Sequence, residues 1–186
     1  MPWTRPETKT LLLMLAALLA PAALAAQDAP APPEARAEDV ASPDAIITAV
    51  YDVISGPAGQ ARDWDRFRSL FMPGARLIPT GPRPNGGFGH SVLTPEDYVS
   101  RAGPSLERDG FFEREINRVE ERYGPVLHAF STYESRRTAA DAEPFARGVN
   151  SFQFFYDGTR WWVTTIYWFA ETAEHPLPAR YLPPGG

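Results

Sequence analysis

The sequence predicts an α+β protein in which helices cover one face of a single curved sheet. Two observations lead to this prediction. In the first half of the chain apolar residues recur at helical spacing, and from about residue 111 they follow the period of two that is typical of strands. Because the helices come first and the strands follow, we expect an antiparallel sheet packed on N-terminal helices.

Three helices are expected before residue 110. The first begins after Ser42, which suits an N-cap, and ends at the "GPAG" segment. The second is short and is capped by Asp63, and the "MPGA" that follows it leads into a short strand, "RLIPT". The third opens on Thr94 and runs to about Asp109. A loop rich in Gly and Pro is expected between them over residues 80–92.

Four strands are expected in the second half of the chain. "FFEREINRVEERY" and "PVLHAFSTYESRR" are long strand candidates, and in the first of them Phe112, Ile116 and Val119 are expected to face the interior. "RGVNSFQFFY" and "RWWVTTIYWFAE" then form a hairpin about Asp157 and Gly158, because Asp-Gly is a strong turn signal.

The predicted hairpin is aromatic on both of its faces. One set of positions holds Phe152, Phe154, Trp161, Tyr167 and Phe169, and the other holds Phe155, Trp162 and Trp168. We expect one face to pack under the helices and the other against a partner subunit or the C-terminal tail. Alternatively, the inner face lines a cavity for an apolar, ring-containing ligand.

The turn of the hairpin leaves two registers open. A two-residue loop pairs Phe154 with Trp161, whereas a three-residue loop with a Gly bulge shifts the partners by one residue. A slip of one residue exchanges the partners across the hairpin, so the register decides which aromatic set faces inward.

The first 26 residues have the features of a secretory signal. Arg5 and Lys9 form a positive start, "LLLMLAALLA" is a short apolar core, and small residues follow it. An uncleaved anchor is the alternative, and Pro21 argues against it. Residues 27–41 are rich in Ala, Pro and charge and predict a flexible leader. We therefore expect an exported protein, periplasmic or secreted, with no membrane span after signal cleavage.

The composition argues against several classes of function. The chain has no cysteine, and Lys9 is its only lysine, so the mature protein has no thiol nucleophile and no Schiff-base lysine. A net charge of -5 argues against nucleic-acid binding, which needs a basic face. The three histidines have no metal-like spacing, and no cofactor motif is present. We therefore expect neither a metal nor a cofactor.

The segment "DWDRFRSLFMPGARLI", from Asp63 to Ile78, is similar to the helix-to-strand entry of the nuclear-transport-factor-2-like (SnoaL-like) superfamily. The capped helix at Thr94 and the four strands, ending in "DGTRWWV", fit the same order. The resemblance places the domain at residues 42–172, with an irregular tail over 173–186. It implies a cystatin-like, cone-shaped fold, with a pocket between a bent sheet and a long helix.

Members of that superfamily include ketosteroid isomerases, dehydratases, polyketide cyclases and epoxide hydrolases, together with binding or dimerising modules that catalyse nothing. The fold therefore leaves the function open. Catalysis in such a pocket needs a base and a donor to an oxyanion. His128, Glu134 and Asp97 are the candidate bases, and the first two are preferred. The alternatives are a hydrogen-bonded strand histidine and a carboxylate paired with nearby Arg136 or Arg137.

The candidate pocket residues are polar or aromatic side chains on the predicted third helix and strands. They are Tyr98, Asn117, Tyr133, Asn150, Phe152, Trp162 and Tyr167. No acid–base constellation stands out, so we expect a module that binds a small, largely apolar ligand without catalysis. The alternative is an isomerase, dehydratase or cyclase with a His or carboxylate base facing the cavity. A homodimer formed through the sheet is a third reading.

Overall fold

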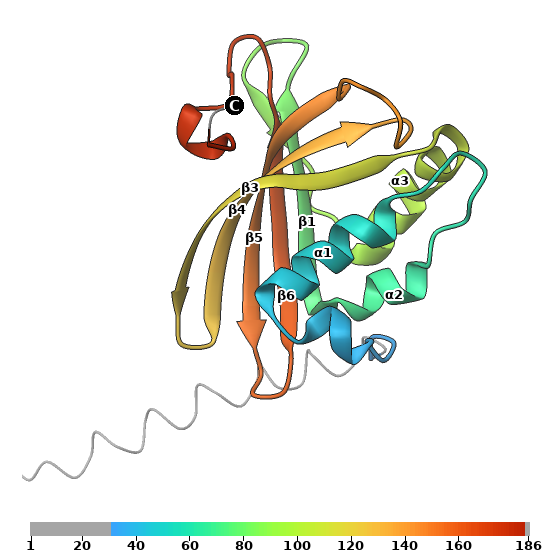
Figure 1. Ribbon diagram of the computed structural model, residues 1–186, viewed down its shortest axis with the longest axis vertical. Helices are drawn as coiled ribbons and strands as arrows, with labels where there is room; N and C mark the ends of the chain where they lie inside the picture. The colour runs from blue at the N-terminus through green and yellow to red at the C-terminus, as the bar shows by residue number, and fades with distance from the viewer. Residues whose placement is uncertain (1–30, 185–186) are drawn as a thin grey trace, which may run out of the picture. The chain divides into compact units, whose positions relative to one another are not determined.

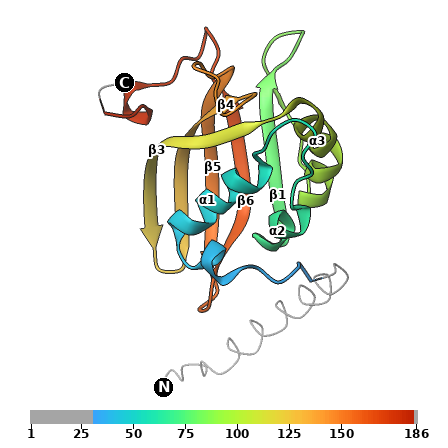
Figure 2. The ribbon, with the colours of Figure 1, turned by 45° about the vertical axis from the view of Figure 1, so that its right-hand side comes forward.

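A computed structural model of the chain describes residues 31–184. Within them, a single curved sheet carries three α-helices on one face (Figures 1 and 2). The fold is α+β with a cone-like organisation, as the sequence predicts. The predicted signal at residues 1–26 lies outside the described residues. Within residues 31–184, no helix is long and apolar enough to cross a membrane.

The three helices lie where their capping residues predict them. They are α1 (Pro43–Ile54), α2 (Trp64–Ser69) and α3 (Pro95–Asp109). The Ser42 side chain accepts a hydrogen bond from the Ala45 amide at 3.1 Å, which satisfies one free donor at the start of α1. Thr94 and Asp97 form a reciprocal capping box at the start of α3.

The sheet has six strands in the order β2-β1-β6-β5-β4-β3. The strands are β1 (Phe71–Pro82), β2 (Phe88–His90), β3 (Phe112–Tyr123), β4 (Val126–Arg136), β5 (Ala146–Tyr156) and β6 (Trp161–Ala170). Neighbouring strands are antiparallel except β1 and β6, which are parallel. The expectation of a purely antiparallel sheet is therefore wrong at this one pair.

The predicted loop over residues 80–92 is partly strand. β1 begins at Phe71 and continues to Pro82, and β2 turns back along it with Thr80 opposite His90. The "MPGA" segment lies inside β1, where a register shift between Phe71 and Arg76 makes room for it. The Gly and Pro residues therefore mark an irregular strand and a tight hairpin rather than a loop.

The β5–β6 hairpin adopts neither of the two expected registers. Its strands are joined by residues 157–160, and Phe154 pairs with Val163. A bulge then adds one residue to β6, because Gln153 pairs with Thr165 and leaves Thr164 between the two pairs. The bulge reverses the alternation along β6, and it therefore turns the ring of Trp168 towards the helices.

Both ends of the domain differ in detail from the expectation. Residues 37–40, assigned to a flexible leader, form a short 3-10 helix, and Val40 is buried in the core. Asp39 accepts hydrogen bonds from Arg66 at 2.7 and 2.9 Å, which fastens this segment to α2. At the other end, a 3-10 turn at Ala179–Tyr181 brings Tyr181 against Phe130 on the outer face of the sheet.

Candidate functional site

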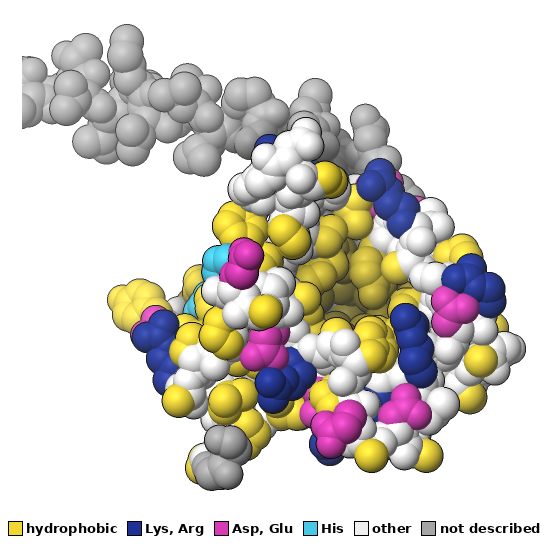
Figure 3. Space-filling model, turned by 90° about the horizontal axis from the view of Figure 1, so that it is seen from above, with side chains coloured by type: hydrophobic (Ala, Val, Ile, Leu, Met, Phe, Trp, Pro, Cys, Tyr) yellow, Lys and Arg dark blue, Asp and Glu magenta, His cyan; other side chains and the backbone are white. Residues whose placement is uncertain are grey.

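A cavity of about 210 Å³ lies between the helices and the inner face of the sheet. Its lining comes from α1, α2, α3 and five strands and is mostly apolar and aromatic, as is typical of small-molecule sites. Viewed from above, the molecule is hollowed, and hydrophobic side chains line the hollow while charged ones lie around its rim (Figure 3). Four polar side chains interrupt the apolar wall: Tyr98, Glu113, Tyr133 and Asn150.

Glu113 is held in place through its main chain. Its amide donates a hydrogen bond of 3.0 Å to the hydroxyl of Ser55, the residue that ends α1. Gly56, which follows Ser55, and Phe111, two residues before Glu113, exchange two backbone hydrogen bonds of 2.7 and 3.0 Å. The start of β3 is therefore clamped to the end of α1, and this clamp aims the Glu113 side chain inward.

The Glu113 carboxylate has hydrogen-bond donors but no cation beside it. Ser135 donates to one oxygen at 2.8 Å and Asn150 to the other at 3.4 Å, and no ion pair to Glu113 occurs within residues 31–184. Burial raises the pKa of Glu113 to about 7, although the bonds from Ser135 and Asn150 act in the opposite direction. A carboxyl group with a pKa near neutrality can both accept and return a proton.

The accessible surface of Glu113 faces two spaces. One is the cavity, and the other is a wider groove of about 740 Å³ between α1 and the start of β3, which also contains Arg114 and Arg136. Glu113 lies at the boundary of the two, because it lines both. Glu113 is thus half-buried, and the part that remains accessible faces the cavity and the groove.

Two tyrosine hydroxyls share the cavity with Glu113. Burial raises the pKa of Tyr98 and of Tyr133, and the nearby Glu113 charge raises both further, so both hydroxyls stay protonated and can donate. Neither hydroxyl has a hydrogen-bond partner in the described part of the chain. Tyr133 passes so close to Gly148 that a β-carbon there would lie 2.6 Å from its hydroxyl. Only glycine at position 148 leaves room for the Tyr133 hydroxyl.

The predicted pocket residues divide between the two faces of the sheet. Tyr98, Tyr133, Asn150 and Phe152 line the inner cavity. Three others do not face it, namely Asn117, Trp162 and Tyr167. Asn117 reaches the carbonyl of Arg180 in the C-terminal tail, and Trp162 lies under Arg160 at 3.6 Å. Asn117 and Tyr167 were expected inside because the bulges of β3 and β6 cannot be read from alternation, and Trp162 because the sequence left the hairpin register open.

Two of the predicted bases, Glu134 and His128, also lie on the outer face, and the third, Asp97, is held in the capping box of α3. Glu134 accepts hydrogen bonds from Arg114 at 2.5 Å and from Arg136. Burial alone would raise the pKa of Glu134, but the two guanidinium groups lower it below the usual value. Glu134 is therefore paired with two arginines. His128 forms a hydrogen bond with Gln153 on the neighbouring strand and does not line the cavity.

The sequence interpretation missed Glu113. It placed Phe112 and Val119 inside, whereas Phe112 borders the groove and Val119 is 44% exposed on the outer face. A signal was nevertheless present on β4, where Ser131 and Ser135 hold alternate positions with Tyr133 on a strand that is otherwise apolar inside. Buried hydroxyls require partners, and they find them in the carboxylates of β3.

The outer face of the sheet also carries aromatic residues, among them Tyr167 and Phe169 of the first predicted set. A groove of about 450 Å³ lies there between the sheet, β2 and the C-terminal tail, and Phe88, Phe169 and His175 meet edge to face within it. Tyr167 beside them is 50% exposed. The tail covers part of this face, and a homodimer through the remainder stays a prediction. Within residues 31–184, no cluster of side chains suited to a metal ion occurs.

Comparisons with known proteins concern the fold. No protein-family model and no curated protein matches the chain. Solved structures do match. One is an NTF2-like protein of unknown function from Shewanella baltica OS155, at 11% identity and a TM-score of 0.43, covering 68% of this chain and 92% of that one. Another is an NTF2-like superfamily protein from Salmonella enterica serovar Typhimurium LT2, at 12% identity and a TM-score of 0.44. The alignment covers 72% of this chain and 85% of that one.

A third similar structure is from Kribbella flavida DSM 17836 and is described as a "putative ketosteroid isomerase". It is 16% identical, has a TM-score of 0.41, and the alignment covers 78% of this chain and 89% of that one. Two of the three descriptions name NTF2-like proteins. At these identities the likeness concerns the fold alone, and the functional argument rests on the cavity.

Proposed function

We propose that this protein is a pocket enzyme of the isomerase type that moves a proton within a small, largely apolar carbonyl compound. The observation that carries the proposal is the Glu113 carboxylate, which faces an apolar cavity without a counter-ion. A buried carboxylate without a cation costs stability, and such groups concentrate at functional sites. From the sequence, a carboxylate base facing the cavity is the feature that distinguishes the enzyme from the binding module, and Glu113 has this feature.

Three polar groups of the cavity have a role in this chemistry. Ionised Glu113 removes a proton from the carbon next to the carbonyl, and negative charge develops on the carbonyl oxygen. The hydroxyls of Tyr98 and Tyr133 stabilise that charge by donating hydrogen bonds to the oxygen. Return of the proton to a different carbon completes an isomerisation and restores the Glu113 carboxylate, so no cofactor enters the balance.

The size of the cavity limits the substrate. A volume of about 210 Å³ is below the roughly 300–1,000 Å³ of sites for drug-sized ligands. At about 30 Å³ for each water molecule in the liquid, it corresponds to roughly seven waters. We therefore infer a substrate with a single ring or a short chain. The signal-like residues 1–26 further support export, to the periplasm or outside the cell, as the place where that substrate is met.

The proposal is tested by proton exchange, which does not require the natural substrate. Cyclohexanone is incubated with the protein in D₂O, and loss of its α-proton signal is followed by NMR. We expect catalysed exchange whose rate rises with pH through about 7, because only ionised Glu113 accepts a proton. Glu113→Gln should reduce the catalysed rate by a factor of about 10²–10⁴, the usual contribution of a general base.

Glu121→Gln is the matched control, because Glu121 lies on the same strand and is exposed to solvent. It should leave the exchange rate unchanged. A folded Glu113→Gln variant with the wild-type rate would contradict the proposal. Binding of cyclohexanone in native mass spectrometry without catalysed exchange would instead support the non-catalytic ligand-binding module.

A further inference from the structure

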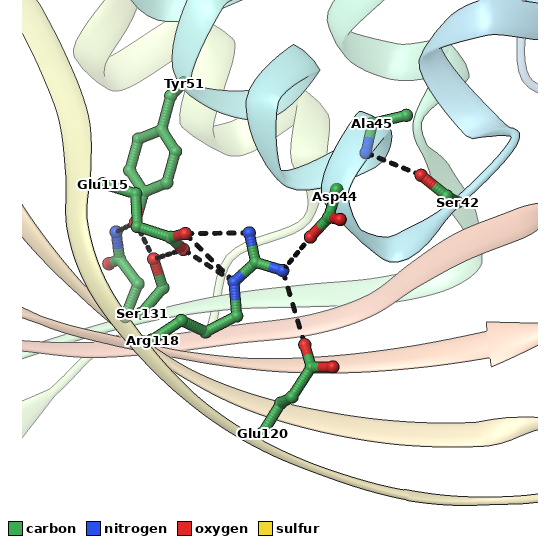
Figure 4. A network of polar contacts seen from close by, with 9 residues as sticks. Ser42, Asp44, Ala45, Tyr51, Glu115, Arg118, Glu120 and Ser131 are labelled. Carbon is green, nitrogen blue, oxygen red and sulfur yellow. Dashed lines mark hydrogen bonds and ion pairs between the residues drawn. The ribbon is translucent and has the colours of Figure 1, made fainter.

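Asn150, which contacts Glu113, is itself the end of a chain of polar contacts that reaches the surface. Its amide nitrogen lies 3.1 Å from the Tyr51 hydroxyl, and that hydroxyl lies 2.7 Å from the hydroxyl of Ser131. Ser131 in turn contacts the carboxylate of Glu115. Figure 4 shows the part of the chain in which Tyr51, Ser131 and Glu115 meet. The contacts join α1 to three neighbouring strands.

The donors in this chain can point in only one direction. An ionised carboxylate accepts hydrogen bonds and never donates, so Ser131 must donate its proton to Glu115. The Ser131 oxygen is then free to accept, and Tyr51 must donate to it. The Tyr51 oxygen therefore accepts from Asn150, which fixes the amide with its nitrogen towards both Tyr51 and Glu113. Each orientation follows from the one before it.

The charge of Glu115 is secured by Arg118. The guanidinium group lies 2.8–3.1 Å from the Glu115 oxygens, and the arginine side chain is only 16% exposed. Burial would lower the pKa of Arg118, but its bonds to Glu115, Asp44 and Glu120 raise it overall, so the arginine stays charged. Its remaining contacts are to Asp44 at 2.5 Å and Glu120 at 3.4 Å near the surface.

We propose that Glu115 is a positioning residue for Glu113, because its fixed charge orients Ser131, Tyr51 and Asn150 so that an amide N–H points at the Glu113 carboxylate. The inference rests on the proposed function in so far as Glu113 is the base. A neutral side chain at position 115 can donate as well as accept, so it would allow the whole chain to reverse. Asn150 would then turn its carbonyl oxygen towards Glu113 and repel the ionised form.

Other groups near Glu113 do not supply this orientation. The tyrosines facing it are Tyr51 from α1, Tyr98 from α3 and Tyr133 from β4, and burial raises the pKa of each so that all stay neutral. The charged groups across the groove are Asp52, Arg114, Arg136 and Asp141. None of these four forms a hydrogen bond with Asn150, Ser131 or Tyr51. The chain from Glu115 is therefore the route to the Asn150 amide.

The test measures the pKa of Glu113 directly. Glutamate is labelled with ¹³C at its carboxyl carbon, the Glu113 signal is assigned by its absence in Glu113→Gln, and its pH titration is followed by NMR. In Glu115→Gln we expect the midpoint to rise by about half a pH unit or more, because the ionised form loses an oriented donor. Removing the Glu115 charge by itself would shift the midpoint downwards, so the sign separates the two effects.

Glu120→Gln is the matched control, because Glu120 contacts the same arginine but lies outside the chain. It should leave the Glu113 midpoint unchanged. Ser131→Ala is a second variant that breaks the chain while keeping the Glu115 charge, and it should also raise the midpoint. An unchanged or lowered midpoint in both chain variants would overturn the inference. Because the titration needs no substrate, absence of proton exchange would count against the proposed function alone.

Discussion

Glu113 and Glu134 are two carboxylates on neighbouring strands, yet the sheet gives them opposite environments. Glu134 pairs across the strands with Arg114, the residue that follows Glu113 in the chain. It faces outward, where Arg114 and Arg136 hold it and lower its pKa. Glu113 faces inward, where it meets a hydroxyl, an amide and aromatic rings, and burial raises its pKa to about 7. Burial alone therefore does not make a site, because the neighbours decide the charge state.

Among the substitutions that test this contrast, removal of the Glu134 charge should have the largest effect on stability. Glu134→Gln should lower the free energy of unfolding, because Arg114 and Arg136 would both lose their counter-ion. The loss is smaller than for a fully buried pair because Arg114 is 70% exposed. Urea unfolding at pH 7 measures it, with exposed Glu121→Gln as the control. A loss no larger than that of the control would contradict the description of Glu134.

The Glu→Gln substitution at position 113 should raise the free energy of unfolding rather than lower it, and by a smaller amount. The folded protein holds a proton on Glu113 up to about pH 7, whereas the unfolded chain releases it near the ordinary value of 4.5. Stability contributed by this group is therefore lost as the pH rises from about 4.5 to 7, and it stays lost above that range. Because glutamine does not ionise, the Glu113→Gln variant does not lose stability in this pH range.

At pH 8 the Glu113→Gln variant should be more stable than the wild type by about 1 kcal/mol, and the gain should vanish near pH 4. The rise of the Glu113 pKa from 4.5 to about 7 would by itself imply a larger gain, but Glu113 keeps contact with the groove, and the substitution alters its bonds to Ser135 and Asn150. Thermal unfolding at both pH values checks the prediction. A destabilised variant at pH 8 would show that ionised Glu113 is well satisfied by its neighbours.

The helices could be predicted from the sequence because their signals are local. Ser42 and Thr94 cap helices through contacts three residues away, so the nearby sequence contains the whole interaction. The α+β order and the β5–β6 hairpin follow from periodicity in the same way. β2 was missed because its pairing with β1 is hidden in a segment rich in Gly and Pro, which by composition predicts a loop.

The site could be predicted only in part because bulges change which side chains face inward. Tyr98, Tyr133, Asn150 and Phe152 lie in regular stretches or on a helix, and their placement in one cavity follows the alternation. In β3 a register shift after Glu115 reverses the alternation, and in β6 Thr164 does the same. Such shifts cannot be predicted from the local sequence, because they arise from pairing with distant strands.

The most direct test of the account is the titration of the two carboxyl groups in one wild-type sample by ¹³C NMR, with each signal assigned from its Glu→Gln variant. We expect the Glu113 signal to titrate near pH 7 and the Glu134 signal below the ordinary glutamate value of 4.5. That result would establish that the cavity holds a carboxyl group able to exchange protons at neutral pH. Similar midpoints for both groups would contradict the central claim that the inner face makes Glu113 a proton-transferring group.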